Sequence, residues 1–403
     1  MAARLICLTG AELFDPAPRG RRDLLVGGGQ VLAVEAAGAL AGSPGLSGLG
    51  ATVEVIDLGG ARIVPGLVDS HVHVGGGGGE SGPASRVPRV PFEALTLGGV
   101  TSCVGVLGTD GTTRTMEDLV ATVLGLREEG LSAWCWTGAY EVPPRTLTGR
   151  VRSDVVFVDP IVGVGELAIS DHRSSQPTFD ELVRIAADCH VAGLMSRKAG
   201  ILHLHLGDGP RGLDLVRRAL AETEIPGRVF HPTHVNRNKR LFEEALDLAK
   251  KGPTVEVTAF PVEDGEDAWS APDAIERFFA SGAPRDRITC SSDGGGCLPT
   301  YDAEGNLLAM GIGDPAAVAG ALAELLRRGH PLADVLPIFT SNPATLLRLH
   351  AKGHLGVGAD ADLVVLDDRH RPRDVMARGR FVVRDGIATV VGRFSPTPPH
   401  RAP

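Results

Sequence analysis

The stretch LVDSHVHV, residues 67–74, is predicted to form a short apolar strand that carries two histidines. His71 and His73 are spaced i and i+2, so both side chains point to the same face of the strand. Seven further apolar strands follow at intervals, with helical patterns between several of them. This alternation is typical of βαβ units and a parallel sheet, and eight such strands over this length predict an α/β fold of the (β/α)8 barrel type.

The seven other predicted barrel strands are equally short and apolar. They are residues 101–108, 132–140, 161–170, 201–208, 229–235, 254–260 and 288–295. Some of the helical patterns begin at a threonine and end at a glycine, which are favoured capping residues. The clearest of these patterns are residues 115–130, 178–193, 212–223 and 241–252.

Both ends of the chain differ from this middle because they consist of short strands broken by turns. The predicted strands are residues 4–14, 23–35 and 51–64 before the barrel and residues 361–367, 375–386 and 387–394 after it. Asp385 and Gly386 join the last two and are a strong hairpin signal. Residues 27–29 and 36–50 are expected to be loops, and the Pro-rich end at 395–403 is expected to be frayed.

These patterns predict two domains. Residues 65–349 are expected to form the catalytic barrel, and residues 1–64 and 350–403 together a small β-rich domain.

Composition limits the classes of function. The chain has 403 residues, a net charge of -9 and no basic run, so nothing in it favours a nucleic acid or an anionic membrane as partner. A small anionic substrate would need a local cluster of arginines. We expect no secretory signal and no membrane span, because no apolar run approaches the roughly 20 residues that a span requires. The six cysteines are scattered without a C-x-x-C pair, which argues against disulfides or a thiolate zinc site and favours a cytoplasmic protein.

Unusual polar residues stand at the ends of the predicted barrel strands, where catalytic groups of such barrels lie. They are His71, His73, Glu166, His205, His234 and Asp293. A single histidine at a strand end is more often a hydrogen-bonded core residue than a ligand, but co-occurrence on several strands favours a shared site. Four imidazoles and two carboxylates at one mouth suit a metal centre, with zinc favoured. His203 lies deeper on the strand of His205, and His231 lies deeper on the strand of His234. Both are predicted to support the ligands or to pack beneath them.

Glu166 raises a question of buried charge. Strand alternation places it on one face with Val162, Val164, Ala168 and Ser170, with no Lys or Arg nearby in sequence. An unpaired carboxylate in such a place costs on the order of several kcal/mol. We therefore expect it to be neutralised, paired or bound to a cation.

Six motifs together resemble the isoaspartyl dipeptidases of the amidohydrolase superfamily. They are GLVDSHVHVGGGGGESG at 66–82, GVTSCVGVLGTD at 99–110, SAWCWTGAYEVPPRT at 132–146, AISDHRS at 168–174, PTHVNRN at 232–238 and SSDGGG at 291–296. The resemblance extends from about Ala61 to the closing strands. It implies a metal-dependent dipeptidase that cleaves the bond between the β-carboxyl of an aspartyl residue and the next amino acid.

The resemblance also implies two divalent metal ions per subunit. His71, His73 and Asp293 would hold the more buried ion, and His205 and His234 the second. Such a pair generates a metal-bound hydroxide near neutral pH and polarises the scissile carbonyl. Asp293 would then shuttle the proton from the nucleophile to the leaving amine.

The substrate residues are also implied by the resemblance. Glu80, helped by Thr109, would bind the α-amino group, and Tyr140 would donate to the carbonyl oxygen as charge develops. Arg173 and Arg237 would bind carboxylates, with a surface ion pair as the alternative for each. Gly78 would offer the substrate a backbone contact at a point where a side chain would obstruct its binding. The glycine run at 75–79 lacks the phosphate-loop pattern, and we expect a mobile lid instead.

Two positions depart from the family pattern. Glu166 stands where the family has a carboxylated lysine that bridges the metals, and it is shorter by about three atoms. Either the strand and the metals shift together, or the site holds a looser or single ion; we expect Glu166 to be the bridging ligand of a binuclear site. Cys297 replaces a substrate-binding serine, and a thiol is the weaker hydrogen-bond partner. It is equally well explained as an ordinary small loop residue.

Two other functions remain open. A cyclic-amide hydrolase of the dihydroorotase or hydantoinase type would share the metal ligands, but Glu80, Tyr140 and the two arginines disfavour it, because a cyclic amide has no α-amino group. A non-catalytic barrel scaffold is disfavoured by the complete set of ligands and base. The resemblance further implies a homo-oligomer that acts on a small β-aspartyl dipeptide.

Overall fold

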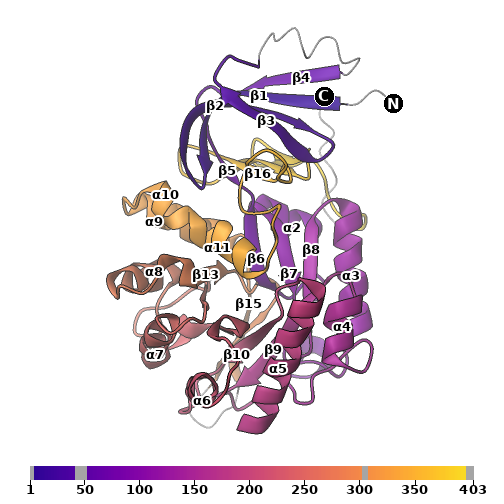
Figure 1. Cartoon of the computed structure of the whole chain (residues 1–403), viewed down its shortest axis with the longest axis vertical. Helices are drawn as coiled ribbons and strands as arrows, with labels where there is room; N and C mark the ends of the chain where they lie inside the picture. Colours follow the sequence, from indigo (N-terminus) through magenta and orange to yellow (C-terminus); the bar gives the residue numbers. More distant parts are fainter. Residues whose placement is uncertain (1–3, 41–51, 302–306, 396–403) are drawn as a thin grey trace.

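The computed structural model describes residues 4–40, 52–301 and 307–395 of the chain. Within these ranges a nine-stranded β-sheet lies at one end of the molecule and a ring of alternating strands and helices at the other (Figure 1). The loop predicted at residues 36–50 falls mostly outside the described residues, as does nearly all of the predicted frayed end at 395–403.

The β-sheet is built from both ends of the chain. From the first end come β1 (Arg4–Asp15), β2 (Ala17–Gly27), β3 (Gln30–Ala36), β4 (Thr52–Asp57) and β5 (Arg62–Pro65). From the second come β16 (Leu363–Leu366), β17 (Pro372–Ala377), β18 (Arg380–Arg384) and β19 (Ile387–Ala388). β16 pairs antiparallel with β5 and so joins the two halves, over a core that includes Leu8, Leu24, Ile63 and Met376. The domain boundaries themselves stay a prediction.

Three predicted strands of this sheet are wrong in detail. The stretch 51–64 is divided into β4 and β5, because Gly59 and Gly60 both take positive φ and turn the chain. The stretch 375–386 is split into β17 and β18, because Arg378 and Gly379 both take positive φ and form a tight turn. The stretch 387–394 forms a strand only at Ile387–Ala388, since the chain then leaves the sheet and the Gly392 N–H donates to Glu93 of helix α2 (Phe92–Leu97) at 3.0 Å. In the predicted loop at 27–29, Gly27 closes β2 and only the next two residues turn.

The ring contains all eight predicted barrel strands. They are β6 (Leu67–Val72), β7 (Val100–Gly105), β8 (Ser132–Thr137), β9 (Ile161–Ile169), β10 (Ile201–Leu206), β11 (Phe230–Thr233), β12 (Val255–Thr258) and β13 (Ile288–Ser291). β6 to β11 form one parallel sheet in chain order, and β12 pairs parallel with β13. The ring closes where the His73 N–H donates to Gly294 O at 2.9 Å. Between β11 and β12, the His234 N–H donates to the Glu256 carboxylate at 3.0 Å.

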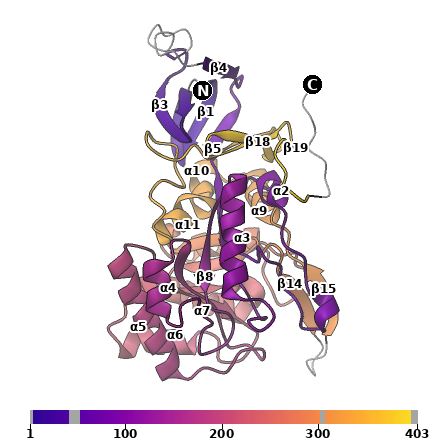
Figure 2. The same cartoon turned by 90° about the vertical axis from the view of Figure 1, so that its right-hand side faces the viewer.

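Helices cover the outside of this barrel and pack their apolar faces on the strands (Figures 1 and 2). They are α2 (Phe92–Leu97), α3 (Met116–Glu129), α4 (Val151–Phe157), α5 (Phe179–Ser196), α6 (Asp214–Glu222), α7 (Lys239–Ala249), α8 (Ala271–Ala280), α9 (Ala317–Arg327), α10 (Leu332–Val335) and α11 (Ser341–Leu346). Thr115 caps α3 and Thr178 caps α5, as the sequence predicts. A hairpin of β14 (Cys297–Tyr301) and β15 (Leu307–Ile312) projects from the barrel beside its mouth (Figure 2).

The alternation predicted along β9 is wrong at one residue. Val164 packs with Leu167 in the cluster beneath the helices, whereas Val162 packs in a separate cluster with Trp136. The pairing with β8 explains this, because Ile161 pairs with Cys135 and Gly163 with Trp136, so that two residues of β9 advance against one of β8 before Val164. A second shift follows against β10, where Val164 pairs with Leu202 and Leu167 with Leu204. Three residues of β9 therefore advance against two of β10, a bulge that ends the alternation just before Glu166.

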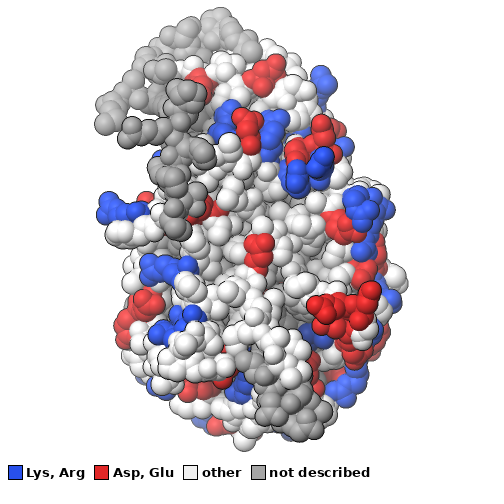
Figure 3. All heavy atoms as spheres, turned by 180° about the vertical axis from the view of Figure 1, so that it is seen from behind, with Lys and Arg blue, Asp and Glu red and all other residues white. Residues whose placement is uncertain are grey.

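The described helices include none that is both long and apolar enough to cross a bilayer. On the face seen in Figure 3, acidic and basic side chains are interspersed.

Candidate metal centre and substrate pocket

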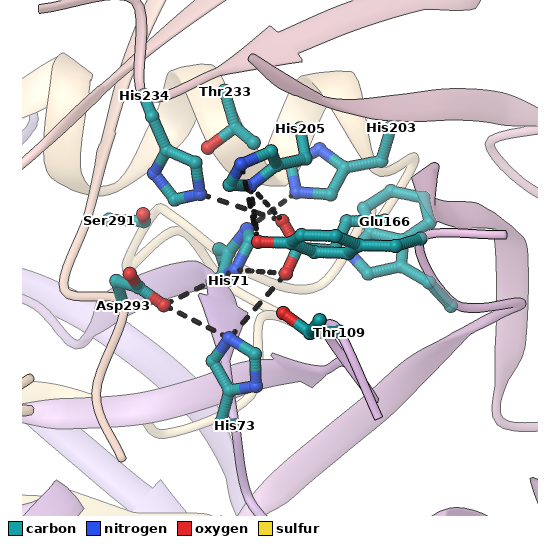
Figure 4. A network of polar contacts seen from close by, with 12 residues as sticks. His71, His73, Thr109, Glu166, His203, His205, Thr233, His234, Ser291 and Asp293 are labelled. Carbon is teal, nitrogen blue, oxygen red and sulfur yellow. Dashed lines mark hydrogen bonds and ion pairs between the residues drawn. The ribbon is translucent and has the colours of Figure 1, made fainter. Parts of the chain in front are cut away.

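The strands bring the six predicted metal ligands to one buried point at the carboxyl end of the barrel (Figure 4). His71, Glu166 and His205 lie on β6, β9 and β10. His73 and His234 follow β6 and β11 directly, and Asp293 stands two residues after the end of β13. Glu166 has no exposed surface, and even Asp293 is only 8% exposed. His234 and Asp293 take left-handed φ values of 61° and 52°.

The Glu166 carboxylate lies between two pairs of imidazoles. Its Oε1 is 3.6 Å from His71 Nε2 and 3.5 Å from His73 Nε2. Its Oε2 is 3.1 Å from His205 Nδ1 and 3.5 Å from His234 Nε2. Burial opposes ionisation of this carboxyl, but the imidazoles, His71 first, outweigh it and hold its pKa well below the usual value. The buried charge is therefore surrounded by potential ligands rather than by apolar side chains alone.

Asp293 completes the first of these pairs. Its Oδ1 lies 3.4 Å from His71 Nε2 and 3.1 Å from His73 Nε2. Burial raises the pKa of this carboxyl too, but the contacts with the two imidazoles hold it below its usual value.

These residues fit divalent cations. Three of the facing atoms, His71 Nε2, Glu166 Oε1 and Asp293 Oδ1, are buried without a hydrogen-bond partner among the described residues. The ligand atoms of His71, His73 and Asp293 lie within 4.8 Å of one another, as do those of His71, Glu166 and His234. Two ligands of one tetrahedral zinc, each at about 2.1 Å, lie about 3.4 Å apart, which matches the spacing of these pairs.

Asp171 supports His205 and was missed by the sequence analysis. Its Oδ2 lies 2.9 Å from His205 Nε2, which leaves Nδ1 of the same ring to face Glu166. Carboxylates commonly orient metal-binding histidines in this way. Burial opposes ionisation of Asp171, but His205 and Arg173 outweigh it and hold its pKa low. The one available signal was its place in the SDHRS motif beside a predicted binding residue.

Glu256 supports His234 and was also missed. Its buried carboxylate accepts from the His234 N–H at 3.0 Å and from Ser291 Oγ at 2.7 Å. It also lies 3.1 Å from Thr258 Oγ1, which is 2.7 Å from His234 Nδ1. A glutamate in the middle of the apolar stretch 254–260 was the signal for such a role.

Glu80 and Thr109 meet at the side of the metal centre. Thr109 Oγ1 donates to Glu80 Oε1 at 3.0 Å, and Arg173 Nη1 lies 3.6 Å from the same oxygen. Glu80 Oε2 is buried and has no hydrogen-bond partner in the described part of the chain. Cys297 lies nearby, and burial, followed by the charge of Glu80, raises the pKa of its thiol to about 12. Cys297 is therefore a neutral thiol at the edge of this pocket.

Tyr140 lies beside the second pair of imidazoles. Its phenol oxygen is 2.7 Å from His205 Nδ1, and the Arg173 guanidinium stands 5.5 Å from the centre of its ring. Burial, followed by the charge of Glu166, raises the pKa of Tyr140 well above its usual value. The phenol therefore keeps its proton and can donate it in a hydrogen bond.

Both predicted arginines are held by carboxylates. Arg173 contacts Asp171 through Nε at 3.0 Å and Nη2 at 2.8 Å, and its side chain is only 11% exposed. Arg237 contacts Asp208 through Nε at 3.1 Å and Nη2 at 3.0 Å. Its Nη1 donates to Leu206 O at 3.0 Å. The ion pair of Arg173 is thus buried beside the site rather than on the surface.

The glycine run is anchored at one end. Two carbonyls, those of Gly75 and Gly77, accept from the buried Arg114 guanidinium at 2.6 and 2.8 Å. Gly78 has φ +75°, and a Cβ there would lie 2.4 Å from Ser85 O, so packing within the loop already requires a glycine. The substrate contact of Gly78 and the mobility of the glycine run as a lid stay predictions. Any movement of this run would have to occur outside the residues that Arg114 holds in place.

Comparison with known proteins gives relatives over nearly the whole chain. A family profile described as the amidohydrolase family matches residues 316–390. The solved β-aspartyl dipeptidase of Fervidobacterium islandicum AW-1, in complex with a β-Asp-Leu dipeptide, is 39% identical, with a TM-score of 0.87 over 95% of this chain and 98% of that one. A solved D-hydantoinase is 15% identical, with a TM-score of 0.66 over 97% of each chain. A deacetylase of Agrobacterium fabrum is 24% identical over 87% of this chain and 79% of its own.

Proposed function

The chain belongs to the β-aspartyl dipeptidase family of the amidohydrolase superfamily, and we propose that it hydrolyses β-aspartyl dipeptides with the help of two divalent cations. The predicted α/β barrel is confirmed by the same similarity. The observation that carries the proposal is the position of Glu166, one of whose oxygens faces His71 and His73 while the other faces His205 and His234.

Glu166 would bridge the two cations in place of a carboxylated lysine. His71, His73 and Asp293 would complete one site and His205 and His234 the other, with zinc favoured by the ligand types. When bound, the cations supply a hydroxide nucleophile near neutral pH and polarise the scissile carbonyl. The glutamate carries its negative charge without any modification.

Asp293 and Tyr140 would manage proton and charge during hydrolysis. Asp293 would accept the proton of the attacking water and return it to the leaving amine, as general base and then general acid. The buried phenol of Tyr140 would donate to the carbonyl oxygen as negative charge develops on it. Asp171 would hold His205 in the tautomer that leaves Nδ1 toward the centre.

Glu80 and the two arginines would recognise the substrate. Glu80 Oε2, for which the described part of the chain offers no hydrogen-bond partner, would bind the α-amino group, while Thr109 fixes the other oxygen. Arg173 and Arg237, each set in place by its own carboxylate, would bind substrate carboxylates. Cys297 would contact the substrate beside Glu80.

A cyclic-amide hydrolase is the competing function. The similarity to D-hydantoinase, at 15% identity, extends to the fold only. Glu80 distinguishes the two, because its second carboxylate oxygen, buried and without a hydrogen-bond partner among the described residues, suits a substrate ammonium group, which a cyclic imide lacks.

The test compares substrates and one variant. The purified protein should contain two divalent cations per chain and hydrolyse β-Asp-Leu, with α-Asp-Leu and hydantoin as matched alternatives. Glu80→Gln should lower kcat/KM for β-Asp-Leu by about 10²- to 10⁴-fold, because removing one partner of a buried charge pair costs about 3–5 kcal/mol. Its cation content should not change, and Glu222→Gln on the exposed side of α6 is the control. Hydantoin turnover without β-Asp-Leu turnover would refute the proposal.

A further inference from the structure

A row of three buried imidazoles runs beneath the candidate metal centre. His71 on β6 has Nδ1 2.8 Å from Nε2 of His203 on β10. His203 Nδ1 lies 2.9 Å from Nδ1 of His231 on β11, and His231 Nε2 lies 3.1 Å from Oγ1 of Thr289 on β13. All three rings have no exposed surface. The row of His71, His203 and His231 thus crosses the barrel interior directly below the ligands, and Figure 4 shows His203 next to His71.

Binding of a cation by His71 Nε2 would fix the direction of every hydrogen bond in this imidazole row. A neutral imidazole has one donor and one acceptor nitrogen. Because Nε2 of His71 faces Glu166 and Asp293 as a ligand atom, its proton belongs on Nδ1, which donates to His203 Nε2. His203 then donates from Nδ1 to His231 Nδ1, and His231 donates from Nε2 to the Thr289 hydroxyl. One arrangement of protons satisfies all three rings at once.

The central ring is also confined. The indole of Trp136 stacks on His203 with centroids 4.9 Å apart and an interplanar angle of 11°. Trp136 is itself anchored, because its Nε1 donates to Ser70 O at 3.1 Å. Stacking on Trp136 and hydrogen bonds at both nitrogens therefore fix the orientation of the His203 ring.

We propose that His203 and His231 are positioning residues that hold the proton of His71 on Nδ1 and aim its Nε2 at the first cation. A metal-binding histidine more commonly donates to a carboxylate or a backbone carbonyl. A carboxylate here would add a third buried negative charge beside Glu166 and Asp293, whereas a neutral imidazole adds none. This inference rests on the proposed cation site and not on the proposed substrate.

The alternative is that the row only fills the core. The sequence allows both, because His203 and His231 alternate with apolar residues of buried strands. A filling role makes a direct prediction: an apolar side chain of similar volume at position 203 should leave cation affinity unchanged. The positioning role predicts the opposite, because the His71 N–H would lose its acceptor and the ring would lose the bond that orients it.

The test measures cation affinity rather than turnover. Metal-free wild type, His203→Leu, His203→Gln and Thr289→Val are titrated with Zn²⁺ against a chromophoric chelator at one pH, with His190→Leu, outside the row, as control. His203→Leu should weaken binding at the tighter site about 10- to 100-fold, the usual cost of losing a partner of a ligand. His203→Gln should restore most of it, because its amide oxygen can accept from His71 and its nitrogen can donate to His231.

Thr289→Val keeps the shape at the far end of the row and removes only the last acceptor, so it should weaken binding about three- to tenfold. If His203→Leu does not fold, Thr289→Val alone tests the positioning role. Thermal unfolding of the metal-free proteins separates stability from affinity. If wild type binds no cation, the proposed metal site fails. If wild type binds and a folded His203→Leu or Thr289→Val protein binds with wild-type affinity, the positioning role is refuted.

Discussion

Replacing Glu166 by Gln tests the centre of the proposed mechanism. The change keeps the shape of a side chain with no exposed surface and removes its charge. Each of its two carboxylate oxygens contacts two imidazoles, at distances between 3.1 and 3.6 Å. In the variant, the amide oxygen can still face one pair of imidazoles. The amide nitrogen then faces the other pair, and it has no lone pair with which to bind a cation. At least one cation should therefore lose its bridging ligand.

The magnitude follows from the burial of this contact. Removing one partner of a buried charge pair costs about 3–5 kcal/mol. Since 1.4 kcal/mol is a factor of ten, the affinity of the affected site should fall by about two to four orders of magnitude. Glu166→Asp keeps the charge and shortens the reach by one methylene, about 1.5 Å, and should give an intermediate loss.

The assay is a Zn²⁺ titration of the metal-free proteins with a count of cations per chain, followed by turnover of β-Asp-Leu. Wild type should bind two cations, and Glu166→Gln should bind no more than one tightly, with kcat lowered by at least the same two orders of magnitude. Far-UV circular dichroism should show the same fold. Two tightly bound cations in a folded Glu166→Gln protein would refute the bridging role.

Three further outcomes are expected. Reconstitution of the metal-free protein with Zn²⁺ should not depend on bicarbonate, because Glu166 needs no carboxylation; a bicarbonate-dependent recovery of cation content would contradict this. Cys297→Ser should leave cation content unchanged and change KM for β-Asp-Leu by less than about tenfold, since it alters one weak hydrogen-bonding group beside Glu80; loss of cations in this variant would assign Cys297 a different role. The metal-free protein should lose stability as the pH falls below about 4.5, because the folded state holds the pKa of Glu166 below its unfolded value of about 4.3 and this contribution disappears on protonation; thermal unfolding between pH 3 and 7 should show a smaller acid loss for Glu166→Gln than for wild type.

The sequence predicted the barrel and the convergence of polar residues at its strand ends because both follow local rules. Short apolar strands alternating with capped helices are visible in a window of a few residues, and polar residues at strand ends converge whenever parallel strands close into a barrel. His71, His73 and Asp293 are therefore brought together as expected. Their roles in catalysis stay predictions until variants are measured.

Local sequence patterns did not predict the residues that support His205 and His234. Asp171 contacts His205 from 34 residues away, and Glu256 contacts the His234 backbone from 22 residues away. Such contacts depend on where neighbouring strands stop relative to one another, which no local pattern determines. The register of β9 against β10 was missed for the same reason, because a bulge is a property of two strands and leaves no mark on the alternation of one.

The bulge in β9 explains how the short side chain of Glu166 faces both pairs of imidazoles. A glutamate has about three atoms less reach than a carboxylated lysine, so it can face both pairs of imidazoles only if its backbone is displaced toward them. The additional residue of β9 lies between Val164 and Leu167, where Glu166 stands, and bulges are known to re-aim a side chain beside a site. The four distances between the carboxylate and the imidazoles differ by only 0.5 Å, from 3.1 to 3.6 Å, so the carboxylate is centred between the pairs. This position presents one oxygen to each pair of imidazoles, which is the arrangement that the proposed binuclear site requires.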